Sequence, residues 1–532
     1  MKGLSRYLWL RIQATALRCC SDVQGLCALS RRSKRFNSTC RDVKVAPSEL
    51  CDIFKNVDIH RIVILEKVTK YDLERRNGLS DSEIRDRFPL AYRTHQTHTK
   101  IMEAIVRQLK ERYSLDTMVI KAQSHNLTLS DLEKSSFPPD LIISAGGDGT
   151  FLEAASMIPP TNPSNKRLFI VGINTDPERS VGALCLSYFK RGTNVFNRYG
   201  NSQSQQSNRE REELPKQNMI RFSETGALVR KECTSDTIGE KEWADISSAS
   251  FCGMHPTVTD QNEGHCTVLS RHTANIYNLT YDEYVGNLLE RLIVKRDYEP
   301  ISRQRIRIKM FKRDQSSPTG IEHNKGDAAC IEEKLFCNRD SQFSCDELNH
   351  ESCDVDSGIL PYGAVNEVII ADENLERTFY GLVQVDSSHI MRVKSSGVLI
   401  STGTGSTAWA YNMCKMNMSN GVNLFKSLMS HPSFPKGAAK HIDVDMMKEA
   451  VESHNANLVF PPSENTLKCI IREAIYETST VDESAYMGTQ VKLLALSKNA
   501  SMYIDGSKVL KLDYGDVVVL KTFDSDTIWS CV

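Results

Sequence analysis

The stretch LIISAGGDGTFLEAASM, residues 141–157, decides the fold. An apolar run ends at a glycine-rich turn, and a helix-like pattern of apolar residues begins directly after it. The turn contains Gly146, Gly147 and Gly149. Glycines lack the Cβ atoms that would keep a phosphate away from the backbone, and the following helix would present its positive end there. We therefore expect a buried strand, a turn that admits phosphate, and a helix that begins near Thr150.

Asp148 lies inside this turn, where its negative charge would oppose a phosphate. A carboxylate in that place can accept a proton from a hydroxyl that attacks phosphorus, or help to position a cation. The alternative is an ordinary N-cap of the helix. The chain has no G-x-x-x-x-G-K-[ST] motif and therefore no P-loop lysine. Spacing alone leaves both interpretations of Asp148 open.

The neighbouring sequence places this turn in a parallel sheet. Apolar, strand-like runs occur at 58–69, 116–122, 140–144 and 167–176, and helical patterns separate most of them. Strands that alternate with helices predict an α/β domain with a parallel sheet, here over 58–190. Ligands of such sheets bind at the carboxyl ends of the strands, which is where the glycine turn lies.

A second candidate loop is STGTGSTAWAYN, residues 401–412. Gly403, Gly405 and Ala408 match a G-x-G-x-x-A dinucleotide fingerprint. That fingerprint requires an acidic residue about 20 positions later, and the sequence has no Asp or Glu over 401–440, which excludes a Rossmann site. The hydroxyl-rich loop still suits a nucleotide, with Trp409 either stacking on a base or packing in the core.

The second half of the chain has a different character. Strand-like runs follow residue 359, around a helical region at 407–454, and the run at 298–311 alternates arginine with isoleucine. These patterns predict a β-rich domain over 279–525. Two polar stretches without apolar period, 191–278 and 313–358, are predicted to be disordered inserts.

Composition excludes some classes of protein. Charged residues make up 25% of the chain and the net charge is −1, so no basic surplus indicates nucleic-acid binding. No run of 18 apolar residues occurs, so no membrane span is expected. The cysteines at 330, 337, 345 and 353 are too widely spaced for a zinc site, and no metal-ligating residues are predicted.

The first 45 residues differ from the rest in charge. Over residues 1–41, Asp22 is the one acidic residue, while Leu4 and Leu8 share one face of a helix. An arginine-rich, acid-poor amphipathic leader predicts a disordered mitochondrial transit peptide over 1–45; the alternative is a disordered basic tail. The basic residues are Lys2, Arg6, Arg11, Arg18, Arg31, Arg32, Lys34, Arg35 and Arg41.

In combination, GGDGT, the strand-borne pair Asn366-Glu367 and the loop TGTGSTAW resemble the motifs of the NAD kinase family. The stretches GINTDPERSVGALCL, RQRIRI and KSSGVLISTGTGSTAW are most similar to its mitochondrial branch. The resemblance implies an α/β N-terminal domain, a β-rich C-terminal domain with the site between them, a homodimer, and the mitochondrial matrix as location.

The resemblance also implies an activity. Members transfer the terminal phosphate of ATP to the 2′-hydroxyl of the adenosine ribose of NAD with a divalent cation, here expected to be Mg²⁺. Asp148 falls on the catalytic proton acceptor, the glycine turn on the phosphate loop, and Asn366 and Glu367 on the pair that binds the adenosine portion of NAD. The residues that fall on the loop lining the nucleotide pocket are Thr404, Gly405, Ser406, Thr407, Ala408 and Trp409.

Three positions depart from the common family pattern. Ser396 stands where many members have Asp, Trp409 replaces a common Tyr, and Ser507 replaces the Gln of a D-G-Q motif. Two other functions share part of the motif set. A lipid kinase also carries GGDGT but needs no Asn-Glu pair, and a catalytically inactive NAD-binding sensor would not need Asp148.

Overall fold

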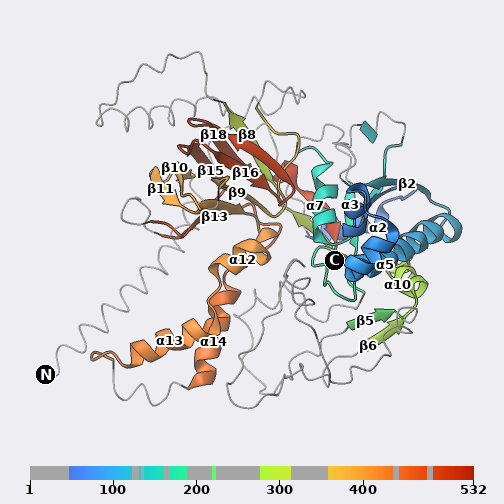
Figure 1. The fold of residues 1–532 in the computed structure, drawn as a ribbon, viewed down its shortest axis with the longest axis horizontal. Helices are drawn as coiled ribbons and strands as arrows, with labels where there is room; N and C mark the ends of the chain where they lie inside the picture. The colour runs from blue at the N-terminus through green and yellow to red at the C-terminus, as the bar shows by residue number, and fades with distance from the viewer. Residues whose placement is uncertain are drawn as a thin grey trace. The chain divides into compact units, whose positions relative to one another are not determined.

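A computed structural model gives the fold (Figure 1). It describes residues 47–122, 131–132, 137–160, 168–188, 219–222, 276–312, 358–374, 376–434, 443–475 and 483–532. The chain divides into the units Met1–Lys44 and Val45–Val532, and every described residue belongs to the second. The predicted leader therefore lies outside the described residues.

The first domain is built on a six-stranded sheet in the order β2-β1-β3-β4-β19-β7. All neighbouring strands run parallel except β19 and β7, which are antiparallel. Every residue of β3 and β4 is buried, as expected for parallel strands covered on both faces. The strands are β1 (Arg61–Glu66), β2 (Asp116–Lys121), β3 (Leu141–Ala145), β4 (Phe169–Ile173), β7 (Pro300–Arg303) and β19 (Ile528–Cys531).

Helices cover both faces of this sheet. On one face, Ile62 and Ile64 share a core with Ile101 of α5; on the other, Val63 and Leu65 share one with α7. The helices of this domain are α2 (Pro47–Asn56), α3 (Lys70–Arg76), α4 (Asp81–Arg87), α5 (Pro89–Arg107), α7 (Asp148–Ser156) and α10 (Tyr281–Leu289), with π-helical turns at Gln108–Arg112 and Glu290–Lys295. Because side chains alternate along β1, its buried even-numbered residues pack against α5 and its buried odd-numbered residues against α7.

Local sequence sets where several of these helices begin. Thr69, Ser80 and Thr280 precede α3, α4 and α10, and each forms a capping box with the acidic residue three positions later. The reciprocal hydrogen bonds satisfy backbone N–H groups that have no partner within the helix. None of the described helices is long and apolar enough to cross a membrane.

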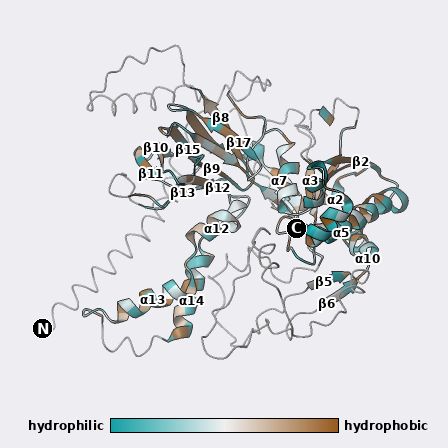
Figure 2. Ribbon diagram, in the orientation of Figure 1, coloured by the Kyte–Doolittle hydropathy of each residue, from teal (hydrophilic) through white to brown (hydrophobic). Residues whose placement is uncertain are grey.

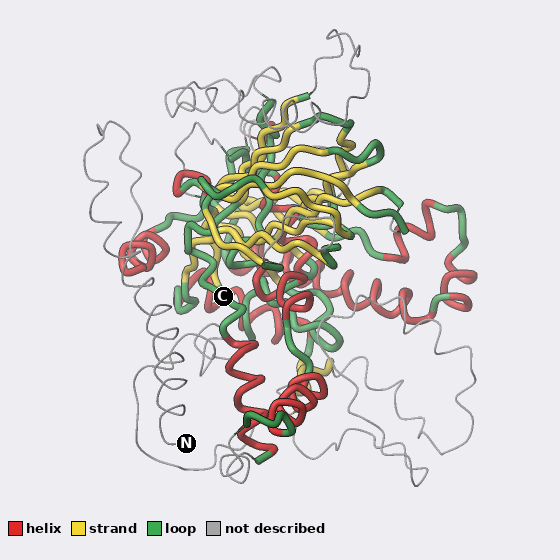
Figure 3. Tube along the Cα trace, turned by 90° about the vertical axis from the view of Figure 1, so that its left-hand side faces the viewer, coloured by secondary structure: helices red, strands yellow, loops and turns green. Residues whose placement is uncertain are grey.

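The second domain is a sandwich of two antiparallel sheets. Their strand orders are β11-β10-β15-β18-β8 and β14-β13-β12-β9-β16-β17. Residues from both sheets, such as Val383 and Ile400, share one apolar core, and the strands lie together in Figure 3 and are largely hydrophobic in Figure 2. The strands are β8 (Ile306–Phe311), β9 (Glu367–Asp372), β10 (Phe379–Val385), β11 (Met391–Ser395), β12 (Gly397–Ser401), β13 (Leu467–Arg472), β14 (Ala485–Gly488), β15 (Gln490–Ala495), β16 (Ala500–Ile504), β17 (Lys508–Leu512) and β18 (Val517–Thr522).

Three helices interrupt the sandwich where the sequence predicted a helical region. They are α12 (Trp409–Cys414), α13 (Met418–Met429) and α14 (Val444–Ala456), and Figure 1 shows them following one another below the strands. The predicted fold class, a parallel α/β domain and a β-rich domain, is confirmed by the two sets of sheets.

The boundary between the domains differs from the predicted one at 279. Tyr284 and Leu288 of α10 are buried in the α/β core, and β7 pairs with β19 in the α/β sheet. The β-rich domain therefore begins near residue 304. The last strand, β19, lies beyond the predicted end at 525 and returns to the first sheet beside β4.

The predicted disordered insert at 191–278 also needs a correction. Strands β5 (Met219–Phe222) and β6 (Ile276–Leu279) pair in parallel. Ile220 and Phe222 are buried in the α/β core, where the Phe222 and Tyr281 rings lie 4.3 Å apart. Their apolar side chains explain why this short piece packs on the domain. The rest of 191–275, and residues 313–357 of the second insert, lie outside the described residues.

Candidate active site

The glycine turn joins β3 to α7, as predicted. Gly146 has a structural role, because its N–H donates to the Ile173 carbonyl at 3.0 Å and a Cβ there would lie 2.2 Å from Thr150 Oγ1. The Gly146 N–H is therefore already used within the protein and is not offered to a phosphate. Around Gly147 and Gly149 no described atom lies within 4 Å of a would-be Cβ, so this part of the turn is open.

Asp148 occupies the first turn of α7, and Gly147 is the N-cap, without a side-chain capping bond. The N-cap interpretation of Asp148 is therefore wrong. Instead, Asp148 Oδ1 accepts the N–H of Leu184 at 2.8 Å, and Oδ2 accepts the N–H of Ala183 at 3.2 Å. A carboxylate has about four acceptor positions, so these two bonds orient it and leave capacity for a further donor.

The loop that holds Asp148 follows β4 and is itself fixed by Asn174. Asn174 Oδ1 accepts the N–H of Asp176 at 2.9 Å, and Asn174 Nδ2 donates to the Ser180 carbonyl at 2.7 Å. Arg179 Nε pairs with Asp176 Oδ1 at 2.9 Å. Burial raises the pKa of Asp176, and Arg179 opposes that rise. These hydrogen bonds hold the backbone of the loop in place, so that the N–H groups of Ala183 and Leu184 remain directed at Asp148.

Lys67 adds a cation to the same edge of the sheet. Lys67 follows β1 directly. Its backbone N–H donates to the Ala145 carbonyl at 3.1 Å, which places the residue beside Gly146. Val63 and Leu65 pack on the α7 face, so the alternation directs the Lys67 side chain toward that face too. Burial lowers the pKa of Lys67, and Asp176 partly offsets this.

Asn366 and Glu367 lie at the start of β9, with Asn366 just before the strand. Asn366 is 8% exposed. Asn366 Oδ1 and Glu367 Oε2 are buried and accept no hydrogen bond from any described group. Burial, and then the nearby Asp505 carboxylate, raise the pKa of Glu367 to about 8. Buried acceptors without donors are rare in folded proteins, so this pair suits a ligand that brings hydroxyl or N–H groups.

The loop at 401–409 packs directly on this pair. A Cβ on Gly405 would lie 2.2 Å from the Asn366 carbonyl oxygen, so only glycine allows the approach. Thr402 N–H donates to the same carbonyl at 3.0 Å. Ser406 Oγ donates to the Gly403 carbonyl at 2.6 Å, which tightens the 3-10 turn Gly405–Thr407. The Asn366–Glu367 pair and the loop at 401–409 therefore pack together as one structural unit.

The remaining predicted residues of this loop divide by exposure. Thr404 is buried and its Oγ1 accepts from Arg303 Nη1 at 3.4 Å. Thr407 is exposed and Ala408 is half-buried. Trp409 is 45% exposed at the start of α12, so the core interpretation is wrong and its ring remains accessible for stacking.

The comparisons with known proteins agree with these motifs. The chain is 24% identical over 498 residues to the mitochondrial NAD kinase 2 of Xenopus tropicalis, covering 88% of this chain and 89% of the relative. It is 22% identical over 482 residues to the human protein of that name, covering 88% and 83%. Over 88% of its length the chain is thus similar to mitochondrial NAD kinases. No family model matches it.

Two solved structures from the NAD kinase family are similar to the chain at 10% sequence identity. Yeast NADH kinase complexed with NADH has a TM-score of 0.40, with 89% of this chain and 84% of that chain covered. An NAD kinase from Archaeoglobus fulgidus in complex with ATP has a TM-score of 0.34, with 87% and 92% covered.

The two groups of NAD kinase motif residues converge through shared packing. Val365, which precedes Asn366, lies in the same apolar core as Phe151 of α7 and as Leu184. Leu184 in turn donates its N–H to Asp148. One core therefore supports both Asp148 and the Asn366–Glu367 segment.

Arginines in the run RQRIRI connect the two domains. Arg305 is fully buried, and its guanidinium donates to the Ile158 and Asp526 carbonyls at 2.6 Å each. It therefore satisfies carbonyls after the C-terminal end of α7, whose first turn carries Asp148. Arg303 donates to Ser530 Oγ at 2.8 Å as well as to Thr404. In the sequence, the only indication of this role is that the arginines occupy every second position of the run.

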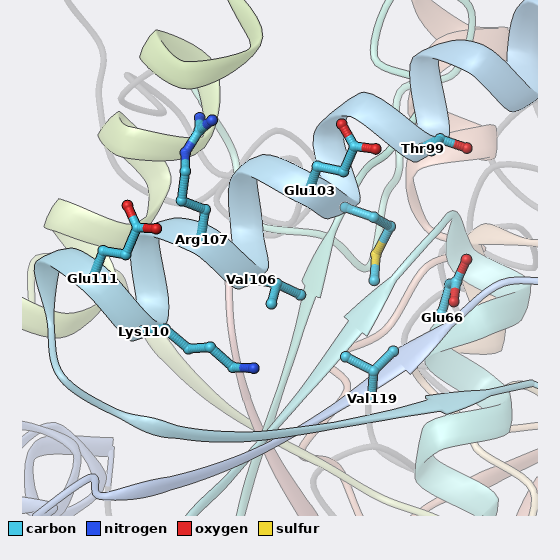
Figure 4. Close-up of a pocket in the computed structure, with 9 residues that line it drawn as sticks. Glu66, Thr99, Glu103, Val106, Arg107, Lys110, Glu111 and Val119 are labelled. Atoms are coloured by element: carbon cyan, nitrogen blue, oxygen red, sulfur yellow. The ribbon is translucent and has the colours of Figure 1, made fainter.

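A separate hollow of about 580 Å³ lies between α5 and β2 (Figure 4). Glu66, Val106, Lys110 and Val119 are among its lining residues. None of the predicted NAD kinase site residues lines it.

Proposed function

We propose that this chain is an NAD kinase that transfers the terminal phosphate of ATP to the 2′-hydroxyl of the adenosine ribose of NAD, making NADP. The observation that carries the proposal is Asp148, held by two backbone N–H groups in a turn that is open at Gly147 and Gly149. The unsatisfied acceptors of Asn366 and Glu367 support a ligand rich in hydroxyl groups. The names of the relatives support the same activity.

In this mechanism Asp148 accepts the proton of the ribose hydroxyl as that oxygen attacks the terminal phosphorus. An ordinary ribose hydroxyl is a poor nucleophile near neutral pH, and a positioned carboxylate base contributes about 10²–10⁴-fold. The N–H groups of Ala183 and Leu184 fix the carboxylate in one orientation. Asn366 and Glu367 accept hydrogen bonds from the adenosine portion of NAD and so orient its ribose.

The phosphates of ATP approach the open part of the turn and the first N–H groups of α7. A divalent cation, Mg²⁺, would neutralise phosphate charge there. Among the described residues no group of three His, Cys, Asp or Glu side chains forms a metal site. Mg²⁺ commonly binds through substrate phosphates, its own waters and one or two carboxylates.

Lys67 is expected to serve ATP in place of a P-loop lysine. Lys67→Met should weaken the binding of Mg²⁺ with a non-hydrolysable ATP analogue about tenfold or more, because one charge-assisted contact is lost. Isothermal titration calorimetry measures this. The matched control is Lys55→Met, which removes an exposed lysine on α2. Equal affinities for the analogue in the Lys67 variant and the wild type would exclude this role.

The direct test of the function is incubation of the purified chain with NAD, ATP and Mg²⁺, followed by a coupled assay for NADP. Production of NADP that depends on ATP supports the proposal. Phosphorylation of a diacylglycerol or sphingosine instead would favour a lipid kinase. Binding of NAD without any NADP would favour a catalytically inactive sensor.

We also propose the mitochondrial matrix as location and a homodimer as the working assembly. The basic leader and the mitochondrial relatives support the location. Fusing residues 1–50 to a fluorescent reporter should direct the reporter into mitochondria, as an arginine-rich amphipathic leader does. The control fusion replaces Arg6, Arg11 and Arg18 with glutamate, which should leave the reporter in the cytosol. Cytosolic signal from the unmodified leader would contradict the prediction.

A further inference from the structure

Asp505 is the first residue of the D-G-S stretch that stands in place of a D-G-Q motif, and it was not among the predicted site residues. It lies in the turn between β16 and β17, with φ at +46°. Its carboxylate accepts three consecutive backbone N–H groups: Val365 at 2.7 Å, Asn366 at 2.9 Å and Glu367 at 3.0 Å. The Asp505 N–H also donates to the Glu367 carbonyl at 3.0 Å. One side chain thus fixes the backbone of the whole Asn366–Glu367 segment.

The hydrogen bonds to Asp505 hold the backbone of Asn366 and Glu367, whose side chains contain acceptors without a donor. Asn366 Oδ1 and Glu367 Oε2 are buried without a hydrogen bond from any described group, and keeping such acceptors in one place costs free energy unless a ligand satisfies them. The Asn366 carbonyl also accepts the N–H of Thr402 and lies in close contact with Gly405. The segment therefore has little freedom to turn its acceptors away from a ligand.

We propose that Asp505 is a positioning residue for NAD, which holds Asn366 and Glu367 so that their acceptors face the substrate. This role rests on the proposed function. Asp505 also sets the charge of the site, because its carboxylate is the charged group that faces Glu367 from the adjoining turn, while Arg305 faces Asp505 from the β7–β8 segment.

The charge effect gives a signature that a purely structural residue would lack. Burial, and then the Asp505 carboxylate, raise the pKa of Glu367 to about 8. Ionised Glu367 accepts hydrogen bonds from ribose hydroxyls better than the protonated form does. NAD affinity should therefore rise as the pH increases through about 8. Removing the Asp505 charge lowers the pKa of Glu367, so the midpoint of this rise moves to lower pH.

Asp505→Asn is the first test variant. Asparagine tolerates a positive φ, but its amide nitrogen cannot accept an N–H, so at least one of the three contacts is lost. NAD affinity, measured by calorimetry on the full chain between pH 6.5 and 9, should fall about tenfold, and KM for NAD should rise accordingly while kcat changes less. Asp505→Gly, which also suits the positive φ, is the second variant and should show the same shift of midpoint.

Asp386 provides a matched control. It also has a positive φ, +48°, follows a strand, and accepts the N–H groups of Thr489 at 3.0 Å and Gln490 at 2.9 Å at the start of β15 in the other sheet. Asp386→Asn should lower thermal stability as Asp505→Asn does, but leave NAD affinity and its pH midpoint unchanged.

The outcomes separate this role from the function itself. If the wild type binds and phosphorylates NAD while both Asp505 variants keep its affinity and midpoint, the positioning role is overturned alone. An equal loss of affinity in the Asp386 variant would also overturn it, because the effect would then be general. If the wild type neither binds NAD nor makes NADP, the role and the proposed function fail together.

Discussion

Replacing Asp148 with asparagine is expected to lower kcat about 100-fold or more, with NAD binding and folding largely kept. The asparagine amide oxygen can still accept one of the N–H groups of Ala183 and Leu184 that hold the carboxylate. It cannot take a proton from the ribose hydroxyl, so the loss falls on the chemical step. Steady-state assays for NADP give kcat and KM, and calorimetry gives NAD affinity.

The control for this prediction is Asp445→Asn. Asp445 also lies in the first turn of a helix, α14, where it is exposed and pairs with Lys448. Its loss should leave turnover unchanged. Turnover near the wild-type value in the Asp148 variant would remove this carboxylate from the mechanism, and a loss of folding would assign it a structural role.

Local sequence predicted the strand, turn and helix at 141–157 because each signal acts over a few residues. The apolar run buries itself, the glycines allow the turn, and the helix follows. What the sequence could not provide was the partner of Asp148. That partner is a pair of N–H groups about 35 positions away, and it exists only because β4 lies beside β3. Long-range partners of this kind have no local sequence signal.

The misplaced domain boundary has a related cause. Helix α10 is amphipathic, and an amphipathic helix can cover either domain. Strand β19 joins the first sheet although it is the last element of the chain. The pairing of β19 with β4 and β7 therefore had to come from the structure.

Buried charge was the least predictable feature of the site. The alternation of arginine with isoleucine in RQRIRI indicates a strand, and charged side chains rarely lie in a core unless they are paired. Arg303, Arg305 and Arg307 are all nearly inaccessible, because β19 and the preceding turn supply carboxylate, hydroxyl and carbonyl acceptors. These acceptors follow residue 523, beyond the motifs on which the resemblance rests.

The buried pair of Arg307 and Asp526 leads to the largest stability effect that we expect. Arg307 Nε donates to Asp526 Oδ2 at 2.6 Å and Arg307 Nη2 to Oδ1, with side-chain exposures of 7% and 0%. Arg307→Met should lower the free energy of unfolding by about 3–5 kcal/mol, because it leaves a buried carboxylate without its partner. Urea denaturation measures the loss, and Arg377→Met, at an exposed arginine, should change stability by less than about 0.5 kcal/mol.

The loss in the Arg307 variant should depend on pH in a defined direction. Burial already raises the pKa of Asp526, and Arg307 opposes that rise. Without Arg307 the folded-state pKa of Asp526 lies further above its unfolded value, so the folded protein binds more protons than the unfolded chain and stability falls as the pH increases. The defect should therefore be larger at pH 8 than at pH 5, and adding Asp526→Leu should recover part of it, since no buried charge then remains at this position. A defect of equal size at both pH values, unrelieved in the double variant, would show that Arg307 acts through packing rather than through its charge.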